Sequence, residues 1–172
     1  HLHRRAIGHH APRLALGSKP GFHWERERFR HPYLRDTLLD LGVLVDTLET
    51  AAPWSRLRAL HASVREAIRK AGAPVVLAHL SHAYPDGASL YFTFLANAPD
   101  PDQALETWSR VKRAACEAIL AAGGTISHHH GVGADHLPWI AAERGEGQLT
   151  LLRAIKQAAD PAGVMNPGKL VP

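Results

Sequence analysis

Hydrophobic and polar residues alternate with a period of two in the segments 41–49 and 89–95. Successive side chains of a β-strand point to opposite faces, so this alternation predicts two strands. A third segment, 75–82, is apolar and begins with β-branched residues, which also favours a strand. The turn-forming residues Tyr84-Pro85-Asp86-Gly87 separate it from 89–95. We therefore expect one strand early in the chain and a hairpin of two strands in its middle.

Two longer segments, 54–71 and 102–122, repeat hydrophobic residues at steps of three and four, which is typical of a helix with one apolar face. Asp100 is expected to cap the second helix at its N-terminus. The apolar positions are Trp54, Leu57, Leu60, Val64, Ala67 and Ile68 in the first helix, and Leu105, Trp108, Val111, Ala115 and Ile119 in the second. Because each helix has a single apolar stripe, we expect both helices on one face of a common sheet.

The segment 125–129 is interpreted as a short fourth strand. The order β-α-β-β-α-β is the split βαβ arrangement of a ferredoxin-like antiparallel sandwich, an α+β fold. Two additional C-terminal helices are expected near 137–143 and 148–159, and the tail 160–170 reads as irregular.

Domain organisation follows from length and periodicity. The 172 residues suffice for one domain with a proper core. Residues 1–31 are rich in His, Arg, Gly and Pro without a clear period, so we expect a connector there and a folded domain over 32–172. The chain opens on His1 and its single methionine is Met165, which favours a piece of a longer protein.

Composition narrows the classes of function. No apolar stretch reaches the length that spans a membrane. The single cysteine, Cys116, excludes an internal disulfide and suits a reducing compartment, so we expect a cytoplasmic protein. The net charge is +4, but the arginines before residue 36 are interspersed with glutamates and no recognised nucleic-acid module is present, so nucleic-acid binding is not expected. The excess of arginine and alanine indicates a GC-rich genome and a bacterial source.

The run Ser127-His128-His129-His130-Gly131-Val132-Gly133 is the main candidate for chemistry. Imidazoles titrate close to neutral pH and can transfer protons, donate hydrogen bonds or bind metals. In a regular strand His128 and His130 would share a face and His129 would point away. No H-E-x-x-H or C-x-x-C spacing is present, so we assign no metal ligands. A solvated polar loop is the structural alternative.

Four further residues have structural alternatives of their own. His79 and His82, at a spacing of three, would not share a face of a regular strand and are interpreted as edge or packing residues. Tyr91 is a candidate proton-transfer residue, or else a core tyrosine with a hydrogen-bonded tip. Arg35 is a candidate anion-binding residue, or else a local partner of Asp36.

Five motifs together resemble the alkyldihydroxyacetonephosphate synthase family and, more broadly, the C-terminal domain of FAD-linked oxidases of the vanillyl-alcohol-oxidase type. They are Pro32-Tyr33-Leu34-Arg35-Asp36, Glu49-Thr50-Ala51-Ala52-Pro53-Trp54, Leu90-Tyr91-Phe92-Thr93-Phe94, Gly123 through Gly133, and Asp160-Pro161 through Asn166. The resemblance covers nearly everything from Gly21 to the end. The histidine run and its spacing from Tyr91 point to the synthase branch.

That resemblance implies an upstream FAD-binding domain, absent from this chain, and a substrate domain that covers the flavin ring. The implied reaction exchanges the acyl chain of acyl-dihydroxyacetone phosphate for a fatty alcohol, in ether lipid synthesis. Tyr91 matches the general acid/base, and His128, His129 and His130 match a catalytic triad beside substrate and flavin. His129 and Asn166 are implied to contact the cofactor, and Arg35 to bind the anionic substrate group. The chain alone is expected to be inactive.

Two alternatives stay open at this point. The first is the C-terminal domain of an FAD-dependent 2-hydroxy-acid dehydrogenase acting on D-lactate or glycolate, although these usually have Glu-His-Gly where this chain has His-His-His-Gly. The second is a truncated, non-catalytic ferredoxin-like module. For the full enzyme, peripheral membrane contact and a homodimer are left open as well.

Overall fold

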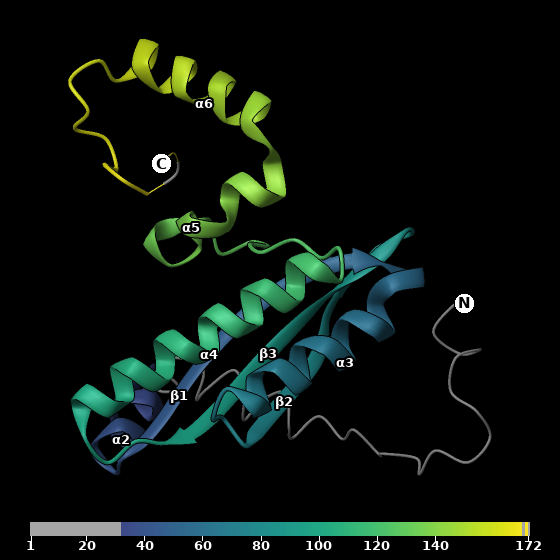
Figure 1. Ribbon diagram of the computed structural model, residues 1–172, viewed down its shortest axis with the longest axis vertical. Coiled ribbons are helices and arrows are strands. Elements are labelled where there is room, and N and C mark those ends of the chain that lie inside the picture. Colours follow the sequence, from purple (N-terminus) through teal and green to yellow (C-terminus); the bar gives the residue numbers. More distant parts are fainter. Residues whose placement is uncertain (1–31, 170, 172) are drawn as a thin grey trace, which may run out of the picture. The chain divides into compact units, whose positions relative to one another are not determined.

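The computed structural model describes residues 32–169 and 171, so the connector predicted for 1–31 lies outside the described residues. The chain divides into two compact units, one ending at Asp36 and one covering Thr37–Pro172. The elements are α2 (Pro32–Asp40), β1 (Val43–Pro53), α3 (Trp54–Lys70), β2 (Val75–Ala83), β3 (Gly87–Asn97), α4 (Pro101–Ala121), α5 (Gly133–Arg144) and α6 (Glu146–Ala159) (Figure 1). The α+β class is confirmed, whereas helix α2 was not foreseen.

The strands form an antiparallel sheet in the order β1-β3-β2. β1 pairs with β3 without interruption, and this register sets Glu49 opposite Tyr91. β2 pairs with the other edge of β3, where His79 is opposite Tyr91. The ladder between β2 and β3 shifts between Leu80 and Ala83, which marks a β-bulge. The hairpin β2-β3 and the earlier strand β1 thus bring Glu49, Tyr91 and His79 into one row.

The fourth strand predicted for 125–129 is wrong: the part of the chain that the structure describes contains a sheet of three strands. The backbone N–H of Ile126 donates to the Glu143 carboxylate of α5 at 3.0 Å, and the Thr125 hydroxyl donates to the same carboxylate at 2.6 Å. His129 has a φ of +63°, a left-handed conformation that no regular strand contains. The backbone N–H of Thr125 donates to the Ala51 carbonyl of β1 at 3.1 Å, and beyond it side-chain bonds and a turn replace strand pairing in this segment.

Helices α3 and α4 lie side by side across one face of the sheet, as the apolar stripes predict (Figure 1). The core between helices and sheet consists largely of Leu57, Leu60, Val64, Ile68, Leu90, Phe92, Phe94, Val111, Ala115 and Ile119. Two predicted stripe positions are wrong, because Leu105 is 63% exposed and Trp54 is 46% exposed. Trp54 is the first residue of α3 and Leu105 the fifth of α4, so both lie near the N-terminal end of their helix.

The opposite face of the sheet carries the alternate residues of the strands, and we call it the open face. This face carries Thr47 and Glu49 of β1, Tyr91 of β3 and His79 of β2. The first three alternate along their strands with core residues, and His79 pairs with Tyr91. Polar and titratable side chains therefore gather on the side away from α3 and α4.

The two C-terminal helices predicted near 137–143 and 148–159 are present as α5 and α6, although α5 begins four residues earlier than expected. α5 contacts both α4 and α6. Among the described helices, none combines the length and the apolar character that a membrane crossing requires.

Candidate functional site

Glu49 is the centre of the open face. Its side chain is only 3% exposed, and its Oε1 atom has no hydrogen-bond partner. Nitrogen atoms of four imidazoles surround the carboxylate. Oε1 faces His128 Nδ1 at 3.5 Å and His82 Nδ1 at 3.7 Å, and Oε2 faces His130 Nε2 at 3.5 Å and His129 Nδ1 at 3.8 Å. We call His82, His128, His129 and His130 the histidine cluster. It includes all three histidines of the run.

The prediction that His129 points away from its neighbours is wrong. The positive φ of His129 turns the backbone within the run, and Gly131 with a φ of +75° turns it again. The left-handed conformation costs a residue other than glycine about 1–2 kcal/mol. In return, the ring of His129 faces Glu49, and its other nitrogen lies 3.3 Å from the Tyr84 hydroxyl. The run converges because it is a turn and not a strand.

His82 also reaches the open face, contrary to the expectation for a spacing of three. The β-bulge between Leu80 and Ala83 inserts an extra residue, so that His82 and His79 share a face. The backbone N–H of His82 donates to Ser89 Oγ at 3.0 Å. The ring of His79 packs on Tyr91 with centroids 5.2 Å apart, so His79 is a packing residue as predicted.

Tyr91 lies beside the histidine cluster on the same face of the sheet. Its hydroxyl donates to Thr47 Oγ1 at 3.1 Å. Its ring meets the ring of His130 edge-to-face, with centroids 5.6 Å apart. Tyr91 is half-buried, so its hydroxyl is hydrogen-bonded and still near solvent. The fold thus brings together Tyr91 and the run, which are more than 35 residues apart in the sequence.

The charge of Glu49 is stabilised by its surroundings. Burial alone would raise the pKa of this carboxyl, but the Ser89 hydroxyl and the imidazoles of His128 and His130 outweigh it, so the pKa lies below the ordinary value. Glu49 is therefore ionised at neutral pH. Sequence reasoning missed this residue, although its position in step with Val45 and Thr47 on the first strand was a usable signal.

A cavity of about 360 Å³ adjoins the cluster at His130 and Thr47. Its wall includes the loop Gly131–Gly133, the buried Lys112 and, from the C-terminal tail, Lys169. The charges in it are mixed, because Lys112 Nζ is 3.5 Å from Asp46 Oδ2 and donates to the Thr47 carbonyl at 3.1 Å.

Asn166 and Arg35 are not joined to the cluster by any described contact. Asn166 lies in the tail and lines a different cavity, of about 310 Å³, next to α6. Asp160 holds that tail, since its carboxylate accepts from the backbone N–H groups of Val164 and Met165 at 3.0 and 2.9 Å. Arg35 is exposed on α2, in the unit that ends at Asp36. One continuous cavity lined by Tyr91, the run and Arg35 stays a prediction.

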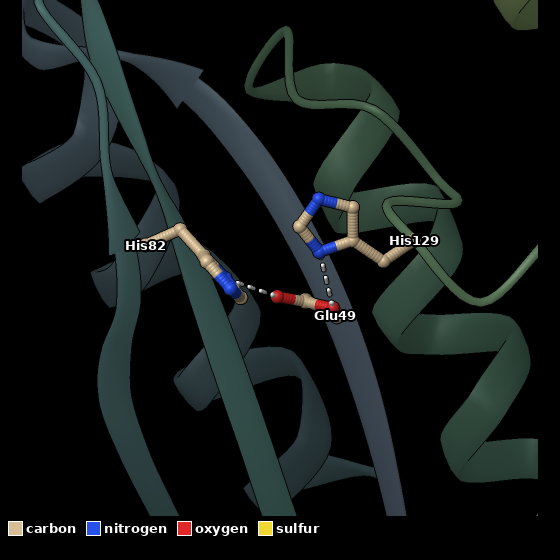
Figure 2. A group of neighbouring side chains, drawn as sticks. All are labelled: Glu49, His82 and His129. Atoms are coloured by element: carbon tan, nitrogen blue, oxygen red, sulfur yellow. Dashed lines mark ion pairs between the residues drawn. The ribbon is translucent and has the colours of Figure 1, made fainter.

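Figure 2 shows Glu49 between His82 and His129, whose nearest ligand atoms all lie within 4.8 Å of one another. This spacing would admit a cation. However, His82 Nδ1, the nitrogen that faces Glu49, is 2.9 Å from the Ser81 hydroxyl. Whether it donates or accepts there, that hydrogen bond occupies the lone pair or proton of the nitrogen. We therefore assign no metal and describe the group as a carboxylate surrounded by imidazoles.

An α+β domain with proton-transfer side chains on the open face of its sheet is suited to covering a ligand held by another domain. Residues 19–170 match the family model "FAD linked oxidases, C-terminal domain", and the chain belongs to this family. It is similar to alkyldihydroxyacetonephosphate synthase of Dictyostelium discoideum, with 36% identity over 92% of this chain and 27% of that protein. A solved structure of alkyldihydroxyacetonephosphate synthase matches with a TM-score of 0.57 and 26% identity over 89% of this chain and 24% of that one.

A shorter similarity, 38% identity over 33% of this chain and 11% of the other, is to the glycolate oxidase subunit GlcD of Escherichia coli strain K12. The chain spans about a quarter of the length of the synthases it matches. FAD is the cofactor of the family, and it is bound mainly by a domain other than this one. The residues of the open face fit a role beside the flavin ring of FAD, since the imidazoles of His129 and His130 are 48% and 42% exposed and can hydrogen-bond outward.

Proposed function

We propose that this chain is the substrate domain of a longer FAD-dependent enzyme that exchanges the acyl chain of acyl-dihydroxyacetone phosphate for a fatty alcohol. An ether C–O bond to the alcohol is formed, the ester C–O bond is broken, and the fatty acid leaves. The observation that carries the proposal is the convergence of Tyr91 and all three histidines of the run on one open sheet face. The similarity to synthases over nine-tenths of the chain supports it.

In this proposal Tyr91 is the general acid/base. Its hydroxyl is held in one direction by Thr47 Oγ1 and is half-buried, which suits proton exchange with a substrate laid on the open face. The ring of His130 meets the tyrosine ring edge-to-face. His129 is held between Glu49, which faces its Nδ1, and the Tyr84 hydroxyl, which faces its Nε2. When bound, FAD supplies the electrophilic centre of the reaction.

The anionic group of the substrate is assigned to Arg35, whose planar guanidinium can bind two phosphate oxygens at once. The cavity beside His130 contributes less, because Lys112 is already paired with Asp46. Asn166 is assigned to the cofactor with His129. We place the full-length enzyme in a bacterial cytoplasm with its upstream FAD-binding domain, in peripheral contact with the membrane that holds its lipid substrates.

The test is product formation by the purified full-length enzyme. We expect an isotopically labelled fatty alcohol to enter the ether product, with release of one fatty acid per product, as measured by mass spectrometry. The surface variant Glu66→Gln on α3 should form the same product, since among the described residues Glu66 pairs with Lys70, one helical turn away and outside the cluster.

The competing function is oxidation of a 2-hydroxy acid, which the shorter similarity to the glycolate oxidase subunit favours. Reduction of a dye acceptor by the same preparation with glycolate or D-lactate, together with no alkyl exchange, would replace the proposal by that activity. Inactivity of a flavin-loaded full-length protein in both assays would leave the non-catalytic module.

A further inference from the structure

We propose that Glu49 is a positioning residue, whose carboxylate holds the histidine cluster in one arrangement beside Tyr91 and keeps a proton within that cluster. The role of this proton in turnover rests on the function proposed above. The geometry of the cluster itself does not.

The arrangement around Glu49 is nearly symmetric. Each carboxylate oxygen faces two imidazole nitrogens, and the four distances fall between 3.5 and 3.8 Å. These separations are longer than a formed hydrogen bond, which needs about 2.7–3.2 Å. One carboxylate therefore faces four imidazoles without a formed hydrogen bond to any of them. A small displacement of the His128, His129 or His130 ring would complete a charged hydrogen bond with it.

Three segments of the chain meet at this carboxylate. Glu49 comes from β1, His82 from β2, and His129 from the loop after α4 (Figure 2). Glu49 Oε1 and His128 Nδ1 are both buried and lack hydrogen-bond partners. The carboxylate oxygen can only accept, and His128 Nδ1 can donate when it carries the N–H of the ring, so burial of these two atoms 3.5 Å apart costs less with a hydrogen between them.

The charges around the cluster show what balances Glu49. Every ion pair found for Glu49 among the described residues is to a histidine. The other titratable groups near the cluster are Tyr84, whose hydroxyl lies 3.3 Å from His129 Nε2, Tyr91 and His79 of the sheet, and Asp135, His136 and Lys169, which line the cavity beside His130. Lysine 112 pairs with Asp46 instead. A buried carboxylate without a protonated neighbour costs several kcal/mol, so its charge favours a proton on one of the four imidazoles.

The consequence for chemistry is a proton held next to the general acid/base. His130 contacts both Glu49 and the ring of Tyr91, so it connects the carboxylate with the tyrosine. Removing the negative charge should allow the cluster to lose its proton at a lower pH. A purely structural carboxylate would affect stability and leave the pH dependence unchanged.

The first experiment uses the full-length flavoenzyme and three variants, Glu49→Gln, Glu49→Asp and the control Glu66→Gln. Flavin content and thermal unfolding identify any variant that fails to fold. We expect Glu49→Gln to lower turnover about 100-fold and to move the limb of the pH profile that the cluster governs to lower pH. Glu49→Asp should keep the limb in place at a reduced rate. A limb unmoved in Glu49→Gln, whatever the rate, would overturn the inference.

The second experiment does not depend on turnover. The full-length protein is labelled at histidine Cε1, and the NMR signals of His82, His128, His129 and His130 are followed against pH. The titration of at least one of these imidazoles should differ between the wild-type protein and Glu49→Gln, because the charged carboxylate no longer faces it. Wild-type signals that do not respond as the pH falls through the pKa of Glu49 would refute the inference even if Glu49→Gln did not fold.

The two measurements separate the proposals. Histidine signals that depend on Glu49 in an enzyme without alkyl exchange would reject the proposed function and keep the positioning role. Alkyl exchange together with histidine signals that are independent of Glu49 would keep the proposed function and reject the positioning role. One equivalent of tightly bound divalent metal in the purified protein, removed by a chelator with loss of the cluster's geometry, would also overturn the inference, because a metal would then replace the proton.

Discussion

Replacing Tyr91 by phenylalanine should separate the chemistry of the open face from its stability. The change removes one hydroxyl and keeps the ring, so the contacts with His79 and His130 remain. The lost hydrogen bond to Thr47 Oγ1 is 3.1 Å long and joins two neutral, half-buried groups. Such a bond contributes about 0.5–1.5 kcal/mol. Water can reach Thr47 after the change, which places the cost at the lower end of that range.

A general acid/base contributes about 100- to 10,000-fold to the rate, which is some 3–5 kcal/mol of transition-state stabilisation. The full-length Tyr91→Phe enzyme should therefore lose at least about 100-fold in turnover, while its unfolding midpoint falls by no more than about 2–4 °C. The assay combines labelled-alcohol incorporation with thermal unfolding and the visible flavin spectrum. Thr47→Val, which removes the acceptor and leaves the tyrosine hydroxyl, is the matched control and should lose far less activity. Near-normal turnover of Tyr91→Phe, or equal losses in the two variants, would refute the assignment of Tyr91.

Four further predictions concern the domain itself. A Cβ at Gly124 would lie 2.8 Å from Thr50 Oγ1 and 3.0 Å from a Leu60 methyl carbon, so Gly124→Ala should lower the free energy of unfolding by about 1–3 kcal/mol. A Cβ at Gly147 of α6 would meet nothing within 4 Å, so Gly147→Ala should raise that free energy by up to about 1 kcal/mol, and urea unfolding compares the two variants. The pKa of Glu49 is lower in the folded state than its ordinary value of 4.5, so the stabilisation by its ionised carboxylate is complete above pH 4.5 and is lost as the pH falls through the folded pKa. Glu49→Gln should therefore flatten the dependence of the free energy of unfolding on pH in this acid range, and an unchanged dependence would count against the ionised carboxylate. Burial raises the pKa of the Cys116 thiol to about 11, so at pH 8 a thiol reagent should react with it only after unfolding, and rapid labelling of the native protein would contradict its burial. The chain by itself should bind FAD weakly, and tight stoichiometric binding in a calorimetric titration would contradict a cofactor held mainly elsewhere.

Local periodicity was sufficient for the elements that carry the core. The apolar stripes of α3 and α4 and the alternation of β1 and β3 are properties of neighbouring residues, and the burial of Leu60, Val64, Phe92 and Phe94 follows from them. The residues of the histidine run and Tyr91 were also identifiable from side-chain chemistry and motif. We expected them to meet because the run would lie on a fourth strand; in the structure the run is a loop, and its His130 ring lies 5.6 Å from the ring of Tyr91 between centroids.

The failures have a common cause, because each depended on partners distant in the sequence. Segment 125–129 has the composition of a strand, but it contacts β1 only where it begins, through Thr125, and the next backbone N–H, of Ile126, bonds to Glu143 on a later helix. His82 reaches the open face only through a bulge, which arises from the pairing of two strands. His129 turns toward Glu49 because the backbone adopts a positive φ, which is uncommon for a residue other than glycine.

The sequence by itself determined which residues could transfer protons and which helices and strands would present them. It did not identify Glu49, an ordinary acidic residue within a strand. Its importance arises from the register that sets it opposite Tyr91, and from the turn that brings three histidines within 3.8 Å of it. Burial converts such a carboxylate from a solvated surface charge into one that needs a proton beside it. That depends on the whole fold, because only the packed structure excludes water from Glu49.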